Sequence, residues 1–183
     1  PGRATWRHVH AHFQSAIMIP HVARLLLLSV LSSAAQAASI CRPQEVPYFR
    51  CSFSGKTAVL CGAVDQVTGG NVFQYRISRG RRIEMQYPGS PLPPESGFRQ
   101  SSILLAHGGE IRVSFSVGEY KYVLYETWDT RSPGYGGIYV LRNGKLARQY
   151  HCEHDIDPKA SFLESGIKKL LQEEEYADIQ AAD

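Results

Sequence analysis

Three groups of residues in the chain have types and spacing suited to chemistry. Glu119, Glu126 and Asp129 are carboxylic acids that could transfer protons as general acids or bases. The segment His151-Cys152-Glu153-His154-Asp155-Ile156-Asp157 contains residue types that bind metal ions. Residues 131–137 read RSPGYGG and offer polar and aromatic groups for contact with another macromolecule.

The segment 131–137 is the strongest of these candidates. Pro133 restricts its conformations, which lowers the entropy lost on binding. Tyr135 supplies a rigid ring with a hydrogen-bonding tip, a common interface anchor, and Ser132 adds a donor and an acceptor. Glycines such as Gly134 allow a second backbone to approach closely. We therefore predict that Ser132, Gly134 and Tyr135 contact a partner, with a plain hairpin loop as the alternative.

The other two groups have simpler structural explanations. A hydrolase would need Glu126 or Asp129 in a cleft beside a second acid or His107, and no nucleophile–base pair is indicated. Neighbouring residues of a strand point to opposite faces, so His151 and Cys152 would diverge. We therefore expect no enzymatic activity, no metal and no cofactor.

Alternating apolar and polar residues predict the strands that position these groups. The pattern covers residues 48–54, 71–78, 82–87 and 111–117, and apolar runs cover 57–64 and 101–106. Gly118-Glu119 and Asn143-Gly144 predict two tight hairpins on either side of the 131–137 loop. The sequence thus predicts an all-β domain at residues 38–155, an antiparallel sandwich or up-and-down barrel of about eight strands.

A C-terminal helix is expected in residues 156–183. Asp157-Pro158 is typical of a helix start, and apolar residues then recur at helical spacing. Gly166 weakens a helix by roughly 1 kcal/mol relative to Ala. Lys168 and Lys169 precede three glutamates, an order that opposes the helix dipole. We expect this helix to pack loosely.

The N-terminal residues 1–37 have the features of a secretory signal behind an over-extended start. Residues 1–17 show no periodicity, Met18 and Arg24 precede an apolar run at 25–31, and Ala35-Gln36-Ala37 resembles a cleavage site. The run is shorter than the roughly 20 residues of a membrane span. We expect a periplasmic or secreted protein that is not held at a membrane after cleavage.

Charge and cysteine content refine this expectation. The chain has 20 Lys and Arg against 17 Asp and Glu, but residues 1–37 hold three arginines and no acid. The remainder is balanced, which argues against a nucleic-acid partner. Four cysteines in an exported chain indicate two disulfides. Neighbouring first and last strands favour Cys51–Cys152, which leaves Cys41–Cys61, while Cys51–Cys61 across a hairpin remains a rival.

Four segments of the chain carry a resemblance to a known family. They are Tyr48-Phe49-Arg50-Cys51, Gln74-Tyr75-Arg76-Ile77, Ile83-Glu84-Met85-Gln86-Tyr87-Pro88 and Gln149-Tyr150-His151-Cys152. Together they resemble the bacterial periplasmic lysozyme inhibitors, most nearly those that act on invertebrate-type lysozymes. The resemblance covers roughly residues 48–152.

The resemblance implies an antiparallel β-fold that inserts a loop with a Ser-Gly-x-Tyr type motif into a lysozyme cleft. Ser132 and Tyr135 have the matching separation, although Pro133 stands where the motif has Gly, and the glycine falls at Gly134. The implied partner is a lysozyme-type glycoside hydrolase. A non-inhibitory periplasmic binding or envelope-maintenance domain of the same fold is the alternative, and a homodimer is left open.

Overall fold

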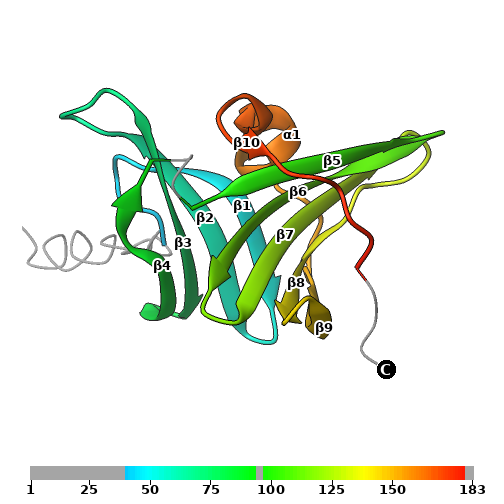
Figure 1. Ribbon diagram of the computed structural model, residues 1–183, viewed down its shortest axis with the longest axis horizontal. Coiled ribbons are helices and arrows are strands. Elements are labelled where there is room, and N and C mark those ends of the chain that lie inside the picture. The colour runs from blue at the N-terminus through cyan, green and yellow to red at the C-terminus, as the bar shows by residue number, and fades with distance from the viewer. Residues whose placement is uncertain (1–39, 94–96, 180–183) are drawn as a thin grey trace, which may run out of the picture. The chain divides into compact units, whose positions relative to one another are not determined.

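The computed structural model describes residues 40–93 and 97–179 (Figure 1). The expected signal segment, residues 1–37, lies outside the described residues. Within the described ranges, no helix combines the length and apolar character needed to cross a bilayer.

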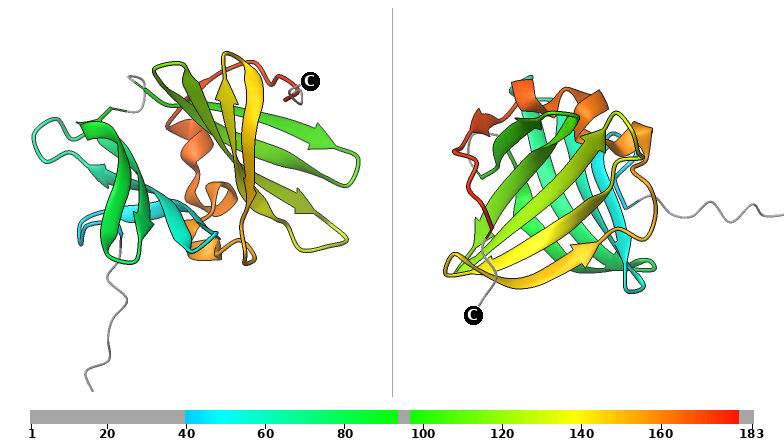
Figure 2. Two further views of the ribbon diagram at one scale, coloured as in Figure 1. Left: turned by 90° about the horizontal axis from the view of Figure 1, so that it is seen from below. Right: turned by 90° about the vertical axis from the view of Figure 1, so that its right-hand side faces the viewer.

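Two sheets form the framework of the domain, which confirms the all-β sandwich (Figures 1 and 2). The four-stranded sheet has the order β1-β2-β3-β4, formed by Val46–Phe53, Lys56–Val64, Asn71–Arg79 and Arg82–Leu92. The six-stranded sheet has the order β10-β5-β6-β7-β8-β9, formed by Gln172–Glu173, Arg99–Leu105, Gly108–Val117, Tyr120–Asp129, Gly136–Arg142 and Lys145–His151. All pairs are antiparallel except β10 with β5.

The predicted hairpins form because their turn residues accept positive φ. Asn143 and Gly144 have φ values of 50° and 81°, and a type I′ turn requires positive φ at both positions. Gly118, at the β6–β7 turn, has φ of 58°. These two hairpins bring β6, β7, β8 and β9 side by side, with the connection between β7 and β8 at the opposite end.

The core between the sheets is largely aromatic. Phe115 stacks on Tyr87 with ring centroids 4.7 Å apart and on Tyr122 at 5.1 Å. Tyr75 of the facing sheet packs on the same ring at 4.9 Å. Such pairs add about 0.5–1.5 kcal/mol each beyond the area they bury, so they fix the spacing of the two sheets.

The predicted C-terminal helix is wrong in its length and in its packing. Three short turns replace it: η3 (Pro158–Ala160), α1 (Phe162–Ser165) and η4 (Ile167–Lys169). Gly166 is left-handed, with φ of 66°, and ends α1 as a C-cap. Phe162 and Ile167 are 1% and 0% exposed and belong to the core, so these turns pack tightly.

The segment 156–179 belongs to the same compact unit as the strands. Beyond β10 it crosses the outer face of the six-stranded sheet (Figure 1). Glu174 accepts hydrogen bonds from Ser114 Oγ at 2.6 Å and Lys121 Nζ at 2.9 Å. Arg112 Nη1 donates to the Ala177 carbonyl at 2.7 Å.

Two disulfides have the favoured pairing, and the rival Cys51–Cys61 bond is wrong. Cys51–Cys152 links β1 to the residue after β9, with Cα atoms 4.9 Å apart. Cys41–Cys61 links the N-terminal segment to β2, with Cα atoms 5.6 Å apart. The first bond therefore joins the two sheets.

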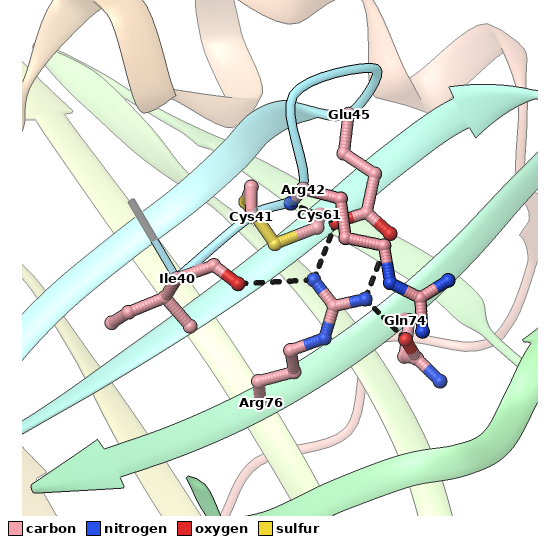
Figure 3. The surroundings of a disulfide bond; sticks show 7 residues. All are labelled: Ile40, Cys41, Arg42, Glu45, Cys61, Gln74 and Arg76. Atoms are coloured by element: carbon pink, nitrogen blue, oxygen red, sulfur yellow. Dashed lines mark hydrogen bonds and ion pairs between the residues drawn. A yellow bond between two sulfur atoms is a disulfide. The ribbon is translucent and has the colours of Figure 1, made fainter. Parts of the chain in front are cut away.

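A buried ion pair holds the N-terminal segment on the outer face of the four-stranded sheet (Figure 3). Arg76, on β3, pairs through both Nη atoms with Glu45, and the two side chains are 3% and 7% exposed. Arg76 Nη1 also donates to the Ile40 carbonyl at 3.2 Å. Burial opposes ionisation of Glu45, but hydrogen bonds from Arg76 and the Arg42 backbone outweigh it and lower the pKa of Glu45.

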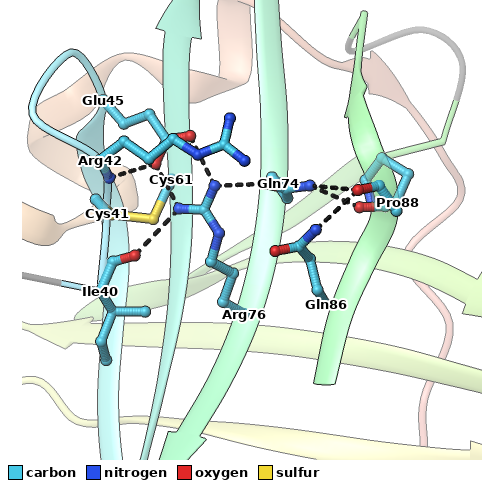
Figure 4. A network of polar contacts seen from close by, with 10 residues as sticks. Ile40, Cys41, Arg42, Glu45, Cys61, Gln74, Arg76, Gln86 and Pro88 are labelled. Atoms are coloured by element: carbon cyan, nitrogen blue, oxygen red, sulfur yellow. Dashed lines mark hydrogen bonds and ion pairs between the residues drawn. A yellow bond between two sulfur atoms is a disulfide. The ribbon is translucent and has the colours of Figure 1, made fainter. Parts of the chain in front are cut away.

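The polar contacts continue across this face to β4 (Figure 4). Gln74 Oε1 accepts from Arg76 Nη2, and Gln74 Nε2 donates to the Pro88 carbonyl at 2.8 Å. Gln86 Nε2 donates to the Gly89 carbonyl at 2.8 Å. Since Glu45, Arg76 and Gln74 are all paired, this network orders the outer face without leaving a desolvated charge.

Candidate functional site

The loop predicted to contact a partner connects β7 to β8. Its first turn is fixed by Asp129, whose Oδ1 accepts from the Arg131 backbone N at 2.8 Å and from Arg131 Nε at 3.4 Å. These hydrogen bonds lower the pKa of Asp129 and keep it ionised. Ser132 and Pro133 follow and are exposed. The loop therefore presents its tip to solvent while its base is held.

Tyr135 is anchored through its backbone and exposed through its side chain. Its N donates to Thr127 Oγ1 at 3.1 Å, and its carbonyl accepts from the Thr127 N at 2.8 Å and from Oγ1 at 3.0 Å. The side chain is 59% exposed, and the ring meets Tyr125 edge-on with centroids 6.3 Å apart. The tyrosine predicted to meet a partner thus lies at the surface.

Gly134 lies close to the backbone of its own strand β7, and its predicted contact with a partner stays a prediction. A Cβ atom at this position would lie 2.1 Å from the Thr127 carbonyl oxygen, closer than real Cβ contacts. Its glycine is therefore required by the close approach of the loop to its own strand β7. Of the three predicted contact residues, Ser132 and Tyr135 are exposed, whereas Gly134 is half-buried.

A group of aromatic residues on the outer face of the six-stranded sheet extends from Tyr135. Tyr125 lies next to it and stacks on Tyr139, with centroids 4.4 Å apart. The Arg112 guanidinium lies 5.9 Å from the Tyr139 centroid and 4.0 Å from the Tyr176 centroid. Cation–π contacts of this kind stabilise by roughly 0.5–2 kcal/mol. The exposed ring of Tyr135 therefore packs against a group of aromatic side chains that contact one another.

Sequence reasoning missed this aromatic support, although one pattern could have revealed it. Gly137 lies opposite Tyr125 in the β7–β8 register, and a Cβ there would lie 2.5 Å from Tyr125 Oη. A glycine pair facing a tyrosine-rich strand indicates that the tyrosine ring lies over the glycine backbone. Burial raises the pKa of Tyr125, so its hydroxyl stays protonated beside His151 Nδ1 at 3.2 Å.

The carboxyl groups considered for acid–base chemistry lie in unlike surroundings. Glu126 is 1% exposed and accepts hydrogen bonds from Ser161 Oγ at 2.9 Å and the Phe162 N at 2.8 Å. Burial raises its pKa to about 7, although the hydrogen bonds lower it in part. This carboxyl therefore caps the C-terminal turns. Asp129 instead pairs with Arg131, and the His107 carbonyl accepts from Thr130 N at 2.8 Å.

The clusters with metal-binding residue types are engaged in other bonds. Ligand atoms of Cys41, Glu45 and Cys61 lie within 4.8 Å of one another, but the two sulfurs form a disulfide and Glu45 pairs with Arg76. In the second cluster Cys152 is bonded to Cys51. Neither pair of cysteines offers a thiolate, the form in which cysteine binds metals.

The β7–β8 loop thus exposes Ser132 and Tyr135 beside the stacked rings of Tyr125 and Tyr139. Similarity to characterised proteins would be a second source of information on its partner. Comparisons with protein-family models, with curated proteins and with solved structures found no match to this chain.

Proposed function

We propose that this protein is an exported inhibitor-like domain that binds a lysozyme-type glycoside hydrolase through the β7–β8 loop. The observation that carries the proposal is Tyr135, whose side chain is 59% exposed while its backbone is hydrogen-bonded to Thr127. The two disulfides are consistent with an oxidising compartment. The periplasm or the extracellular space is the proposed location.

The loop has little conformational entropy left to lose on binding. Asp129 fixes its first turn, Pro133 restricts φ in the middle, and Thr127 holds its end. Immobilising a flexible side chain at an interface costs roughly 0.5–1.5 kcal/mol, and a preorganised loop avoids part of that cost. A tyrosine in this setting is the kind of residue that dominates binding energy.

The chemistry of the loop tip fits the cleft of a glycoside hydrolase. Such clefts generally hold two carboxyl groups on either side of the scissile bond. The hydroxyls of Ser132 and Tyr135 can donate hydrogen bonds to carboxylates, and Arg131 adds a positive charge whose side chain is 66% exposed. Donors and a cation at one tip therefore complement an acidic cleft.

The test is a muramidase assay with the protein added in molar excess. We expect the wild-type protein to inhibit turnover and Tyr135→Ala to weaken binding at least about 30-fold, the loss expected for a hot-spot residue. Tyr120→Ala is the matched control, because Tyr120 begins β7 at the end opposite the loop. Equal inhibition by Tyr135→Ala and Tyr120→Ala, or normal turnover with the wild-type protein, would contradict the proposal.

A non-inhibitory binding domain is the second candidate function. The observation that favours it is Gly134, which packs against Thr127 and does not supply an open backbone at the tip. In that case a pull-down would retain a partner in a Tyr135-dependent manner while muramidase turnover stays normal.

A further inference from the structure

The β1–β2 and β6–β7 turns lie at the same end of the sandwich (Figure 1). A pocket opens between the two sheets at this end. Its volume is about 170 Å³. Apolar and aromatic residues from both sheets line it: Phe53, Tyr75, Ile77, Tyr122, Ile138, Val140 and Tyr150. An apolar cavity of about 150 Å³ is large enough to hold benzene, so this pocket has room for one ring.

Tyr75 lines this pocket with a hydroxyl that lacks a hydrogen-bond partner within residues 40–93 and 97–179. Tyr75 is 0% exposed, so neither water nor a ligand group reaches the hydroxyl unless the side chains that cover it move aside. Burial raises the pKa of Tyr75, and the neighbouring Tyr122 and Tyr150 raise it further, which keeps the hydroxyl protonated. Buried polar groups are nearly always paired, so this hydroxyl indicates a missing polar contact.

Two cations stand at the mouth of the pocket. Lys56 and Arg148 complete its lining, from β2 and β9. Lys56 Nζ pairs with Glu84 Oε2 at 2.5 Å. Arg148 is exposed and forms no ion pair with the residues that the structure describes. Its guanidinium is therefore available to a carboxylate, which it matches in geometry.

We propose that this pocket binds a small aromatic carboxylate that carries a second polar group on its ring. The ring lies between the apolar walls and the carboxylate meets Arg148 at the mouth. The second polar group pairs with the Tyr75 hydroxyl once the side chains that cover this hydroxyl move aside. The pocket does not include the β7–β8 loop, so this ligand site is independent of the proposed binding of a glycoside hydrolase.

The experiment is an NMR titration of the protein with 4-hydroxybenzoate as the probe. Two probes of similar size each lack one group: benzoate has no hydroxyl, and 4-hydroxybenzyl alcohol has no charge. We expect saturable shifts at the pocket residues, with 4-hydroxybenzoate binding about tenfold more tightly than either of the other two, the difference expected for one hydrogen bond or ion pair.

Two variants assign the contacts. Tyr75→Phe should remove the preference for 4-hydroxybenzoate over benzoate, and Arg148→Gln should remove its preference over 4-hydroxybenzyl alcohol. Arg142→Gln, at the nearby β8–β9 turn, should keep both preferences. Tyr75→Phe should also unfold at the same or a higher temperature than the wild-type protein, because it removes an unpaired buried hydroxyl.

Three results would overturn the proposal. The first is the absence of saturable shifts at the pocket residues with millimolar 4-hydroxybenzoate. The second is equal affinity of the wild-type protein for all three probes. The third is a lower unfolding temperature of Tyr75→Phe, which would mean that the hydroxyl already has a partner.

Discussion

Glu126 makes the stability of the folded protein depend on pH. Its pKa is about 7 in the folded chain against an ordinary value of 4.5, because burial disfavours the charged carboxylate. The folded state therefore binds this proton more tightly than the unfolded chain does. The contribution is fully present below pH 4.5 and is lost as the pH rises through 7, by roughly 3 kcal/mol at most.

The variant Glu126→Gln should remove this pH dependence. The amide oxygen can still accept from Ser161 Oγ and the Phe162 N, whereas the side chain no longer ionises. We expect denaturant unfolding to show a flatter stability profile between pH 5 and 8 than the wild-type protein. Glu164→Gln, an exposed change in α1, is the control and should keep the wild-type profile. An unchanged slope in Glu126→Gln would assign the pH dependence to other groups.

The substitution Gly134→Ala tests whether the stability of the protein depends on the close packing of the β7–β8 loop against β7. In Gly134→Ala the new Cβ would lie 2.1 Å from the Thr127 carbonyl oxygen, so the loop must shift. We expect a loss of about 1–3 kcal/mol in unfolding free energy, the usual cost of overpacking. Gly89→Ala is the control, because among the described residues, its two chain neighbours apart, no atom lies within 4 Å of the added Cβ. Equal stability of the two variants would show that the loop yields without cost.

The sequence predicted the exposed part of the candidate site but not its support. Pro133 and Tyr135 are recognisable because restricted backbone and aromatic character are properties of single residues. The stacking of Tyr125 on Tyr139 and the contact of Arg112 with Tyr176 depend on strand register and on a segment more than 60 residues away. Local patterns carry no information about such contacts.

At the scale of elements, the C-terminal turns η3, α1 and η4 cover one end of the hydrophobic core. Phe162 stacks on Phe49 with centroids 5.1 Å apart and is 1% exposed, whereas its neighbour Leu163 is 42% exposed. We expect Phe162→Ala to destabilise the protein by about 3–5 kcal/mol, measured by denaturant unfolding. Leu163→Ala is the matched control and should cost far less. A small effect of Phe162→Ala would mean that the turns are not integral to the fold.

The hairpins were predictable and the C-terminal segment was not, for one physical reason. A type I′ turn is decided by the φ preferences of Asn143 and Gly144 themselves. The apolar residues after 157 instead have helical spacing. The conformation of this segment is set by the burial of Phe162 and Ile167 against strands that are distant in the sequence. Gly166, in the left-handed conformation, ends the helix. Tertiary packing overrides local propensity here.

At the scale of the whole molecule, the two disulfides should differ in their contribution. Cys51–Cys152 spans 101 residues and Cys41–Cys61 spans 20. In the chain-entropy model the longer loop contributes about 1.4 kcal/mol more, because closing it costs the unfolded chain more entropy. We expect Cys51→Ala/Cys152→Ala to lower the unfolding temperature more than Cys41→Ala/Cys61→Ala. If Cys41→Ala/Cys61→Ala lowers the unfolding temperature more, the N-terminal segment and its Arg76–Glu45 ion pair contribute more to stability than the length of the longer loop does.

The strands that end the two sheets have a consequence for self-association. β4 ends the four-stranded sheet and carries Pro88 and Pro91, which lack the N–H needed by an added strand. β9 ends the six-stranded sheet with Lys145 and Arg148, so a second copy would bring like charges together. Amyloid-like growth by sideways strand addition is therefore disfavoured at both of these margins. The opposite edges of the two sheets, at β1 and at β10, do not share this protection.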